Sequence, residues 1–198
     1  AQEYLSHNGD TNDIYQHITV FIDPIDGTRE FSTGMGHHSS VCIGFANEHG
    51  RAVGGVVFRP LTQPKPTWVV GAKNEGYALC DFGEPNSDSQ NCGGGLLTTN
   101  GSISPFIEAL LEELRVPRVK SGGAGNKMML LLEKSINCND GDSGSFLYIQ
   151  DRGVSRWDTC AAEACQEAFG GKLTKMQQIV DSEEDEHYTY LASQNNLD

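Results

Sequence analysis

The order of strand-like and helix-like segments constrains the fold of this chain more than any other feature. Short runs of β-branched and aromatic residues come first, and turn residues bound them. These runs cover residues 17–23, 41–46, 53–58, 68–70 and 77–79. Asn47-Glu48-His49-Gly50 joins the second run to the third, which predicts an antiparallel hairpin. Pro24 fixes its own φ angle, so we expect the first strand to end there in a turn.

Helical patterns dominate after a loop rich in Gly, Pro and Asn over residues 83–95. Ser104 suits an N-cap and Pro105 the first helical position, and apolar residues follow on one face. Further helices are expected from about 125 to 134 and from 158 to 169. Strands followed by helices interleaved with strands are typical of a mixed α/β layered sandwich. We expect one domain over residues 1–198.

Composition excludes several function classes. The 198 residues carry 27 Asp and Glu against 14 Lys and Arg, a formal charge of −13. Duplex nucleic acid is therefore an unfavourable partner, because its binding rests on Lys and Arg that neutralise phosphates. The longest aliphatic run, Met128 to Leu132, has five residues, far fewer than the ~18 that a membrane span needs. We expect no membrane span, whereas a small anionic substrate stays possible where divalent cations reverse the local charge.

The six cysteines are scattered along the chain without a CxxC pair. In a chain of this length they are typical of reduced thiols rather than of a disulfide framework. We therefore expect an intracellular, reducing compartment, with cytoplasm and organelle not distinguished.

The densest group of chemically useful residues is Asp23-Pro24-Ile25-Asp26-Gly27-Thr28. A turn at Pro24 can bring the two carboxylates toward one point, where they repel each other unless a cation lies between them. Oxygen ligands without His or Cys favour a hard ion such as Mg²⁺. Gly27 lets the backbone approach a ligand closely. The backbone amides of Gly27 and Thr28 can hold an oxyanion, and the Thr28 hydroxyl can orient a water. The alternative is an Asx-type turn, in which the Asp side chains bond their own backbone.

A second group is Trp157-Asp158-Thr159-Cys160-Ala161-Ala162, in which Asp158 lies 135 residues after Asp23. By itself Asp158 is expected only to cap a helix. Both groups together resemble the two motifs of the inositol-monophosphatase-like family of Mg²⁺-dependent, lithium-sensitive phosphatases, a D-P-[IL]-D-[GS]-T turn and a later W-D-x-[CA]-A helix start. The resemblance implies an α+β layered sandwich of the αβαβα type. We expect this chain to lack the N-terminal helical layer and the last helix of that fold.

The resemblance also implies roles for residues. The family binds two or three Mg²⁺ ions, and Asp23 would bridge two of them. The Ile25 carbonyl would bind one of these two ions, and Asp26 and Asp158 would bind the other. Thr28 helps to activate the attacking water, and the amides of Gly27 and Thr28 hold the phosphate. In two-metal phosphoryl transfer, one ion activates the water while the other stabilises the leaving oxygen.

A glycine-rich segment indicates a branch of the family. Gly122-Gly123-Ala124-Gly125-Asn126-Lys127 resembles the 3′(2′),5′-bisphosphate nucleotidases, which remove the 3′-phosphate of 3′-phosphoadenosine 5′-phosphate and leave AMP. Glycines at a helix start suit an anion, and Lys127 can add a charge for a second phosphate. The alternative is a tight strand–helix junction with Lys127 in solvent.

A further metal ligand and other functions are alternatives that the sequence allows. Glu3 lies 20 residues before Asp23, the place of a further metal-binding Glu in some family members, but a terminal Glu is usually solvated. An inositol phosphate is an alternative substrate, and a non-catalytic structural subunit, as a homodimer or in a larger assembly, is an alternative function. His37 and His38 are expected to lie in a solvated loop rather than to bind a metal.

Overall fold

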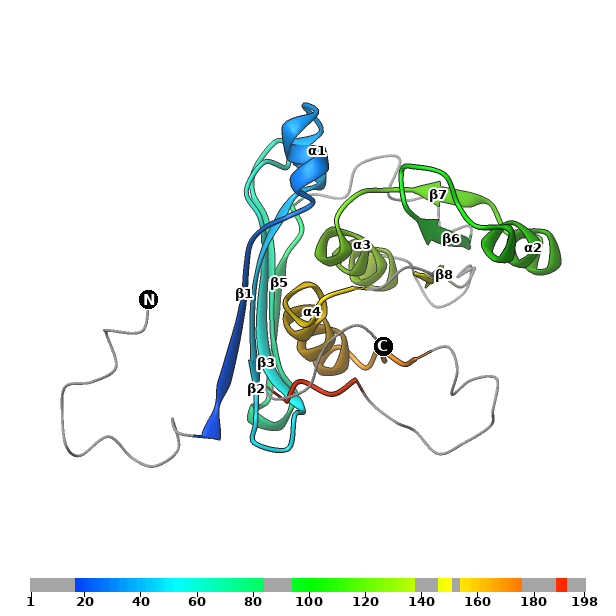
Figure 1. Cartoon of the computed structure of the whole chain (residues 1–198). Helices are drawn as coiled ribbons and strands as arrows, with labels where there is room; N and C mark the ends of the chain where they lie inside the picture. The colour runs from blue at the N-terminus through cyan, green and yellow to red at the C-terminus, as the bar shows by residue number, and fades with distance from the viewer. Residues whose placement is uncertain (1–16, 84–93, 138–145, 151–153, 176–187, 192–198) are drawn as a thin grey trace, which may run out of the picture.

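The computed structural model describes residues 17–83, 94–137, 146–150, 154–175 and 188–191. In this part of the chain two β-sheets enclose two long helices, and a further helix lies beyond the smaller sheet (Figure 1). The predicted mixed α/β layered sandwich is confirmed.

The larger sheet contains all five predicted strand segments and is antiparallel throughout. Its spatial order follows the chain order, because short connections join neighbouring strands. The strands are β1 (Thr19–Asp26), β2 (Ser40–Ala46), β3 (Ala52–Arg59), β4 (Thr67–Ala72) and β5 (Tyr77–Asp81).

Strand β1 continues through Pro24 to Asp26, so the prediction that it ends at Pro24 is wrong. β1 is an edge strand, where a residue without an N–H group is tolerated. Asp23 pairs with Cys42 and Asp26 with Ser40, so β1 holds one extra residue between them. Residues three apart in a regular strand point to opposite faces. This irregularity allows the carboxylates of Asp23 and Asp26 to meet.

Within the described ranges, the smaller sheet is parallel and has three short strands in the order β7-β6-β8. They are β6 (Gly95–Thr98), β7 (Arg118–Lys120) and β8 (Phe146–Tyr148). Helix α2 (Pro105–Leu114) connects β6 to β7 and begins as predicted, because the Ser104 hydroxyl accepts a hydrogen bond from the Ile107 amide at 3.3 Å. These strands of three or four residues have too weak a pattern to be predicted.

Helices α3 (Ala124–Asn137) and α4 (Arg156–Ala168) form the layer between the sheets. Helix α4 packs on β2, β3 and β4 through strand glycines. A Cβ atom on Gly55 would lie 2.3 Å from the Ala161 carbonyl oxygen, so helix and strand backbones are in direct contact. Helix α4 begins two residues earlier than predicted, with Ser155 as its N-cap.

Short helical segments complete the described part of the chain. These are α1 (Thr28–Ser32) and the 3₁₀ helices η2 (Gly36–His38) and η3 (Lys73–Glu75). None of the helices in the described ranges is long and apolar enough to cross a membrane. The cysteines in those ranges, Cys42, Cys80, Cys160 and Cys165, are free thiols.

Candidate functional site

Three aspartates from distant parts of the chain meet at one point. Asp23 and Asp26 lie at the end of β1, and Asp158 lies in the first turn of α4. One carboxylate oxygen from each lies within 4.8 Å of the others. The structure therefore brings together the three acidic side chains that the two sequence motifs singled out.

Asp26 is the most enclosed of the three, with 6% of its surface exposed. It accepts hydrogen bonds from the Ser40 hydroxyl at 2.7 Å and from the backbone amides of Ala124 and Gly125 at 3.0 and 2.9 Å. Burial raises the pKa of Asp26 and the charge of Asp23 adds to this, whereas the three hydrogen bonds lower the pKa. Asp26 is thus held by distant groups, not by an Asx-type turn.

Asp23 makes the local contact that the alternative interpretation predicts. Its Oδ1 accepts a hydrogen bond from the Ile25 amide at 3.0 Å, which is an Asx-type contact. The Thr28 hydroxyl donates to the Ile25 carbonyl at 2.9 Å. The turn is therefore both a local Asx-type motif and one half of a carboxylate cluster.

Asp158 occupies the third helical position rather than the N-cap. Its Oδ2 accepts a hydrogen bond from the Ser155 amide at 2.7 Å. Burial raises the pKa of Asp158 to about 6, and the nearby Asp23 and Asp26 add to the rise. A bound cation would relieve this repulsion between carboxylates. The atoms of the cluster that could bind a cation are all carboxylate oxygens, a set that suits a hard divalent cation.

The turn that contains Gly27 and the glycine-rich segment 122–127 lie against each other beside the three aspartates. Gly27 and Gly123 have φ angles of 78° and 62°, in the left-handed region that favours glycine. A Cβ atom on Gly27 would lie 3.3 Å from the Gly123 Cα, and one on Gly123 would lie 2.8 Å from Asp26 Oδ2. Gly122 has even less space, because a Cβ there would lie 2.2 Å from the Glu30 Cγ.

The start of α3 holds an anion, but that anion is a side chain of the protein. The amides of Ala124 and Gly125, which open the helix, both donate to Asp26. The sequence suggested a phosphate at this helix start. In the structure these two amides orient a carboxylate of the cluster instead.

Lys127 is buried, with 5% of its surface exposed, so the alternative that placed it in solvent is wrong. Its ammonium donates to Gln150 Oε1 at 3.3 Å and lies 4.9 Å from the centre of the Tyr148 ring. Burial lowers the pKa of Lys127, while the charges of Asp26 and Glu30 oppose this shift. Lys127 thus lies close enough to Asp26 to sense its charge.

Sequence reasoning missed several residues that organise this region. Ser40 lies opposite Asp26 in the β1–β2 pair, so an alignment of the two strands could have found it. Asn126 belongs to the glycine-rich segment but received no role. His38 Nδ1 lies 3.4 Å from the Gly122 amide and 3.3 Å from Asn100 Nδ2. His38 therefore contacts the glycine-rich segment. His37 is exposed as expected, although both histidines lie in the 3₁₀ helix η2 rather than in a loop.

Glu3, the further candidate metal ligand, lies outside the described residues. Its role as a metal ligand beside the three aspartates stays a prediction.

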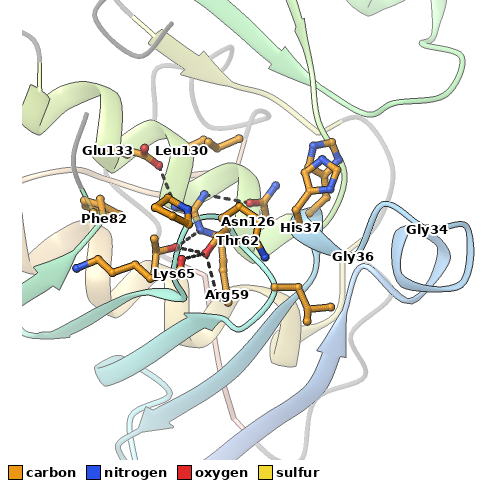
Figure 2. Close-up of a pocket in the computed structure, with 16 residues that line it drawn as sticks. Gly34, Gly36, His37, Arg59, Thr62, Lys65, Phe82, Asn126, Leu130 and Glu133 are labelled. Atoms are coloured by element: carbon orange, nitrogen blue, oxygen red, sulfur yellow. Dashed lines mark hydrogen bonds and ion pairs between the residues drawn. The ribbon is translucent and has the colours of Figure 1, made fainter. Parts of the chain in front are cut away.

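A pocket of about 600 Å³ lies on another side of the start of α3 (Figure 2). Residues from η2, from the β3–β4 connection and from α3 line it, and the three aspartates do not. Its charged groups are paired: Arg59 with Glu133 at 2.9 Å, and Lys65 with Asp81 at 2.8 Å. The pocket is thus separate from the carboxylate cluster, although Asn126 lies beside it (Figure 2).

Known proteins resemble this chain in sequence and in fold. The 3′(2′),5′-bisphosphate nucleotidase 1 of Rattus norvegicus is 31% identical over 161 residues, which cover 79% of this chain and 49% of that protein. The protein of the same name from Homo sapiens is 34% identical over 164 residues, with the same coverage. Inositol monophosphatase 3 of Danio rerio is 26% identical over 161 residues, 80% of this chain and 44% of that protein. The chain spans about half the length of these relatives.

Solved structures with the same fold include an inositol monophosphatase from Zymomonas mobilis. It has a TM-score of 0.59 and 20% identity, and the match covers 93% of this chain and 64% of that one. An IMPase/NADP phosphatase complexed with Mg²⁺ and phosphate has a TM-score of 0.59 and 15% identity, with 93% and 63% of the chains covered. At these identities the similarity establishes the fold.

A model of the inositol monophosphatase family matches residues 2–195, nearly the whole chain. The match includes both aspartate-containing motifs and the glycine-rich segment between them. The chain therefore belongs to the inositol monophosphatase family.

Proposed function

We propose that this protein is a Mg²⁺-dependent phosphomonoesterase. The observation that carries the proposal is the convergence of Asp23, Asp26 and Asp158, whose oxygens lie within 4.8 Å of one another. Family membership and the solved relative complexed with Mg²⁺ and phosphate support it.

The residues present suit Mg²⁺ because all the candidate ligands are oxygens. Asp23 would be shared between two ions, with the Ile25 carbonyl on one and Asp26 and Asp158 on the other. Glu3 is the proposed further ligand, for two or three ions in all. Bound Mg²⁺ would supply positive charge that favours ionisation of a water and stabilises the leaving oxygen.

The chain's own groups would position the reactants. The Thr28 hydroxyl, now bonded to the Ile25 carbonyl at 2.9 Å, would orient the attacking water. The amides of Gly27 and Thr28 would hold the phosphate, with Gly122 and Gly123 closing the other side. The tight contact between Gly27 and Gly123 supports one shared binding surface.

The proposed substrate is 3′-phosphoadenosine 5′-phosphate, hydrolysed at the 3′ position to AMP and phosphate. Two relatives above 30% identity are named 3′(2′),5′-bisphosphate nucleotidase. Lys127 supports a substrate with two phosphates, because a buried ammonium near the cluster offers a second positive charge. Relatives named inositol monophosphatase 3, at 25–26% identity, make an inositol phosphate the alternative substrate.

Phosphate release by the purified full-length protein tests the proposal. Release from 3′-phosphoadenosine 5′-phosphate should require Mg²⁺, and Asp26→Asn should abolish it. Asp81→Asn is the matched control and should leave the rate unchanged, because Asp81, at the end of β5, pairs with Lys65 of the β3–β4 connection. Full activity of Asp26→Asn would contradict the assigned role of Asp26.

A comparison of kcat/KM between the bisphosphate and an inositol monophosphate decides the substrate, since specificity is a ratio of transition-state binding. Hydrolysis of neither compound would favour the non-catalytic subunit, as a homodimer or in a larger assembly. The four free cysteines of the described ranges support a reducing compartment for the protein.

A further inference from the structure

Arg59, at the end of β3, is an almost fully buried cation beside the pocket (Figure 2). Only 4% of its surface is exposed. Its guanidinium donates from Nε to Thr67 Oγ1 at 2.8 Å, from Nη1 to Asn126 Oδ1 at 3.2 Å and from Nη2 to Glu133 Oε2 at 2.9 Å. The planar fork is thereby fixed on three sides.

Asn126, in the first turn of α3, is 1% exposed. Because Arg59 donates to its Oδ1, the amide can turn only one way, and its NH₂ group points to the preceding segment. Nδ2 donates to the Ser121 hydroxyl at 2.9 Å and to the Gly122 carbonyl at 3.0 Å. Asn126 therefore ties β3 to the backbone between β7 and α3.

The same backbone carries the two amides that hold Asp26. Ala124 and Gly125 follow directly after the segment that Asn126 binds, and they donate to Asp26 at 3.0 and 2.9 Å. The contacts thus run from Arg59 through Asn126 and residues 121–125 to the Asp26 carboxylate. A network of buried hydrogen bonds restricts the groups it joins to one geometry.

We propose that Asn126, oriented by Arg59, is a positioning residue for the metal ligand Asp26. It acts on the metal site without touching it, because it fixes the backbone whose amides set the direction of the Asp26 oxygens. This inference rests on the proposed function in that Asp26 is taken to bind a divalent cation. Outer-sphere partners of metal ligands typically change metal affinity 10–100-fold when they are replaced.

Asn126→Asp tests the proposal, because it keeps the size and the acceptor that Arg59 uses but removes the NH₂ donor. A carboxylate would also face the Gly122 carbonyl, which repels it. We expect the affinity of the purified protein for Mn²⁺, measured by electron paramagnetic resonance without substrate, to fall about tenfold. The control is Leu132→Val, which removes one buried methylene from the same helix outside the network.

Arg59→Lys provides a second test in case Asn126→Asp does not fold. Lysine keeps a charge for Glu133, but one ammonium cannot reproduce the fork that also reaches Thr67 and Asn126. Mn²⁺ affinity should fall here too. The double variant should bind Mn²⁺ no more weakly than Asn126→Asp alone, because both changes act through one pathway.

Three outcomes would overturn the proposal. The first is unchanged Mn²⁺ affinity in a folded Asn126→Asp or Arg59→Lys variant. The second is an equal loss in Leu132→Val, which would show that affinity follows stability alone. The third is failure of the unmodified protein to bind Mn²⁺, which would also contradict the metal site of the proposed function. The first two outcomes leave the proposed function intact, so the two failures are distinguishable.

Discussion

The Asp26 carboxylate accepts a hydrogen bond from the Gly125 amide at 2.9 Å, across 99 residues of sequence. This contact joins the end of β1 to the start of α3, elements that belong to different layers of the fold. The negative carboxylate thereby meets the positive end of the helix dipole, which the amides that open the helix carry. The geometry of the carboxylate cluster therefore depends on how the layers pack.

The packing of α4 on the larger sheet predicts a sharp contrast between two adjacent glycines. A Cβ on Gly55 would lie 2.3 Å from the Ala161 carbonyl oxygen, so Gly55→Ala must push helix and strand apart. We expect a loss of about 3 kcal/mol or more in the free energy of unfolding. A Cβ on Gly54 meets only ordinary contacts, the nearest at 3.7 Å, so Gly54→Ala should be as stable as the unmodified protein or slightly more stable. Urea unfolding of both variants measures the contrast, and equal losses would contradict it.

Ser40 should matter for the metal site beyond its effect on folding. Ser40→Ala removes a 2.7 Å hydrogen bond to Asp26 and leaves that buried carboxylate with one partner fewer. Loss of such a charged hydrogen bond costs about 1.5–3 kcal/mol. We expect lower stability and a smaller rise of the melting temperature on addition of Mg²⁺. Ser32→Ala, which removes only an exposed bond to the Arg29 carbonyl, is the control and should change neither quantity.

The buried carboxyl of Glu163 predicts a pH dependence of stability. Burial raises the pKa of Glu163 to about 7 from 4.5, the charge of Glu167 adds to the rise, and the Tyr190 hydroxyl and Arg51 oppose it. The folded state thus favours the protonated acid. The stability that Glu163 contributes is complete below about pH 4.5 and is lost as the pH rises to about 7, by at most about 1.4 kcal/mol per pH unit.

Glu163→Gln should remove this dependence, because the amide stays neutral and can still accept a hydrogen bond from Tyr190. The variant should match the unmodified protein at pH 4.5 and be the more stable of the two at pH 8. Denaturant unfolding at a series of pH values makes the comparison. Parallel curves for the two proteins would show that the pKa of Glu163 is the same in the folded and unfolded states, which would contradict the prediction.

Lys127 should distinguish substrates with two phosphates from those with one. If its ammonium binds the second phosphate, Lys127→Gln should lower kcat/KM for 3′-phosphoadenosine 5′-phosphate by about 10- to 100-fold, or about 1.4–2.7 kcal/mol of transition-state binding. The effect on 3′-AMP, which has a single phosphate, should be much smaller. Equal losses on both compounds would assign Lys127 a general structural or electrostatic role instead.

Local patterns predicted the strands of the larger sheet and the three long helices because those segments have clear periodicity and caps. Ser104 caps α2 as expected. The extension of β1 through Pro24 was missed because the edge position of a strand is a property of the sheet, not of its own residues. The strands of the smaller sheet were missed because three or four residues carry too little pattern.

The acidic cluster could be predicted because its two motifs are specific together, although they lie 135 residues apart. The environment of each residue in and around the cluster could not be predicted. Contacts at long range decide that the α3 amides bind Asp26 and that Lys127 is buried beside Tyr148. Asn126 illustrates the same limit, since its partner Arg59 lies at the end of β3, 67 residues earlier in the sequence.

The most direct test of the central claim is anomalous diffraction from crystals of this protein soaked in Mn²⁺. Manganese takes the oxygen-rich sites that magnesium occupies and gives a measurable anomalous signal. The account predicts anomalous peaks within about 2.0–2.4 Å of carboxylate oxygens of Asp23, Asp26 and Asp158. Crystals that hold Mn²⁺ elsewhere, with no peak between these three side chains, would contradict it.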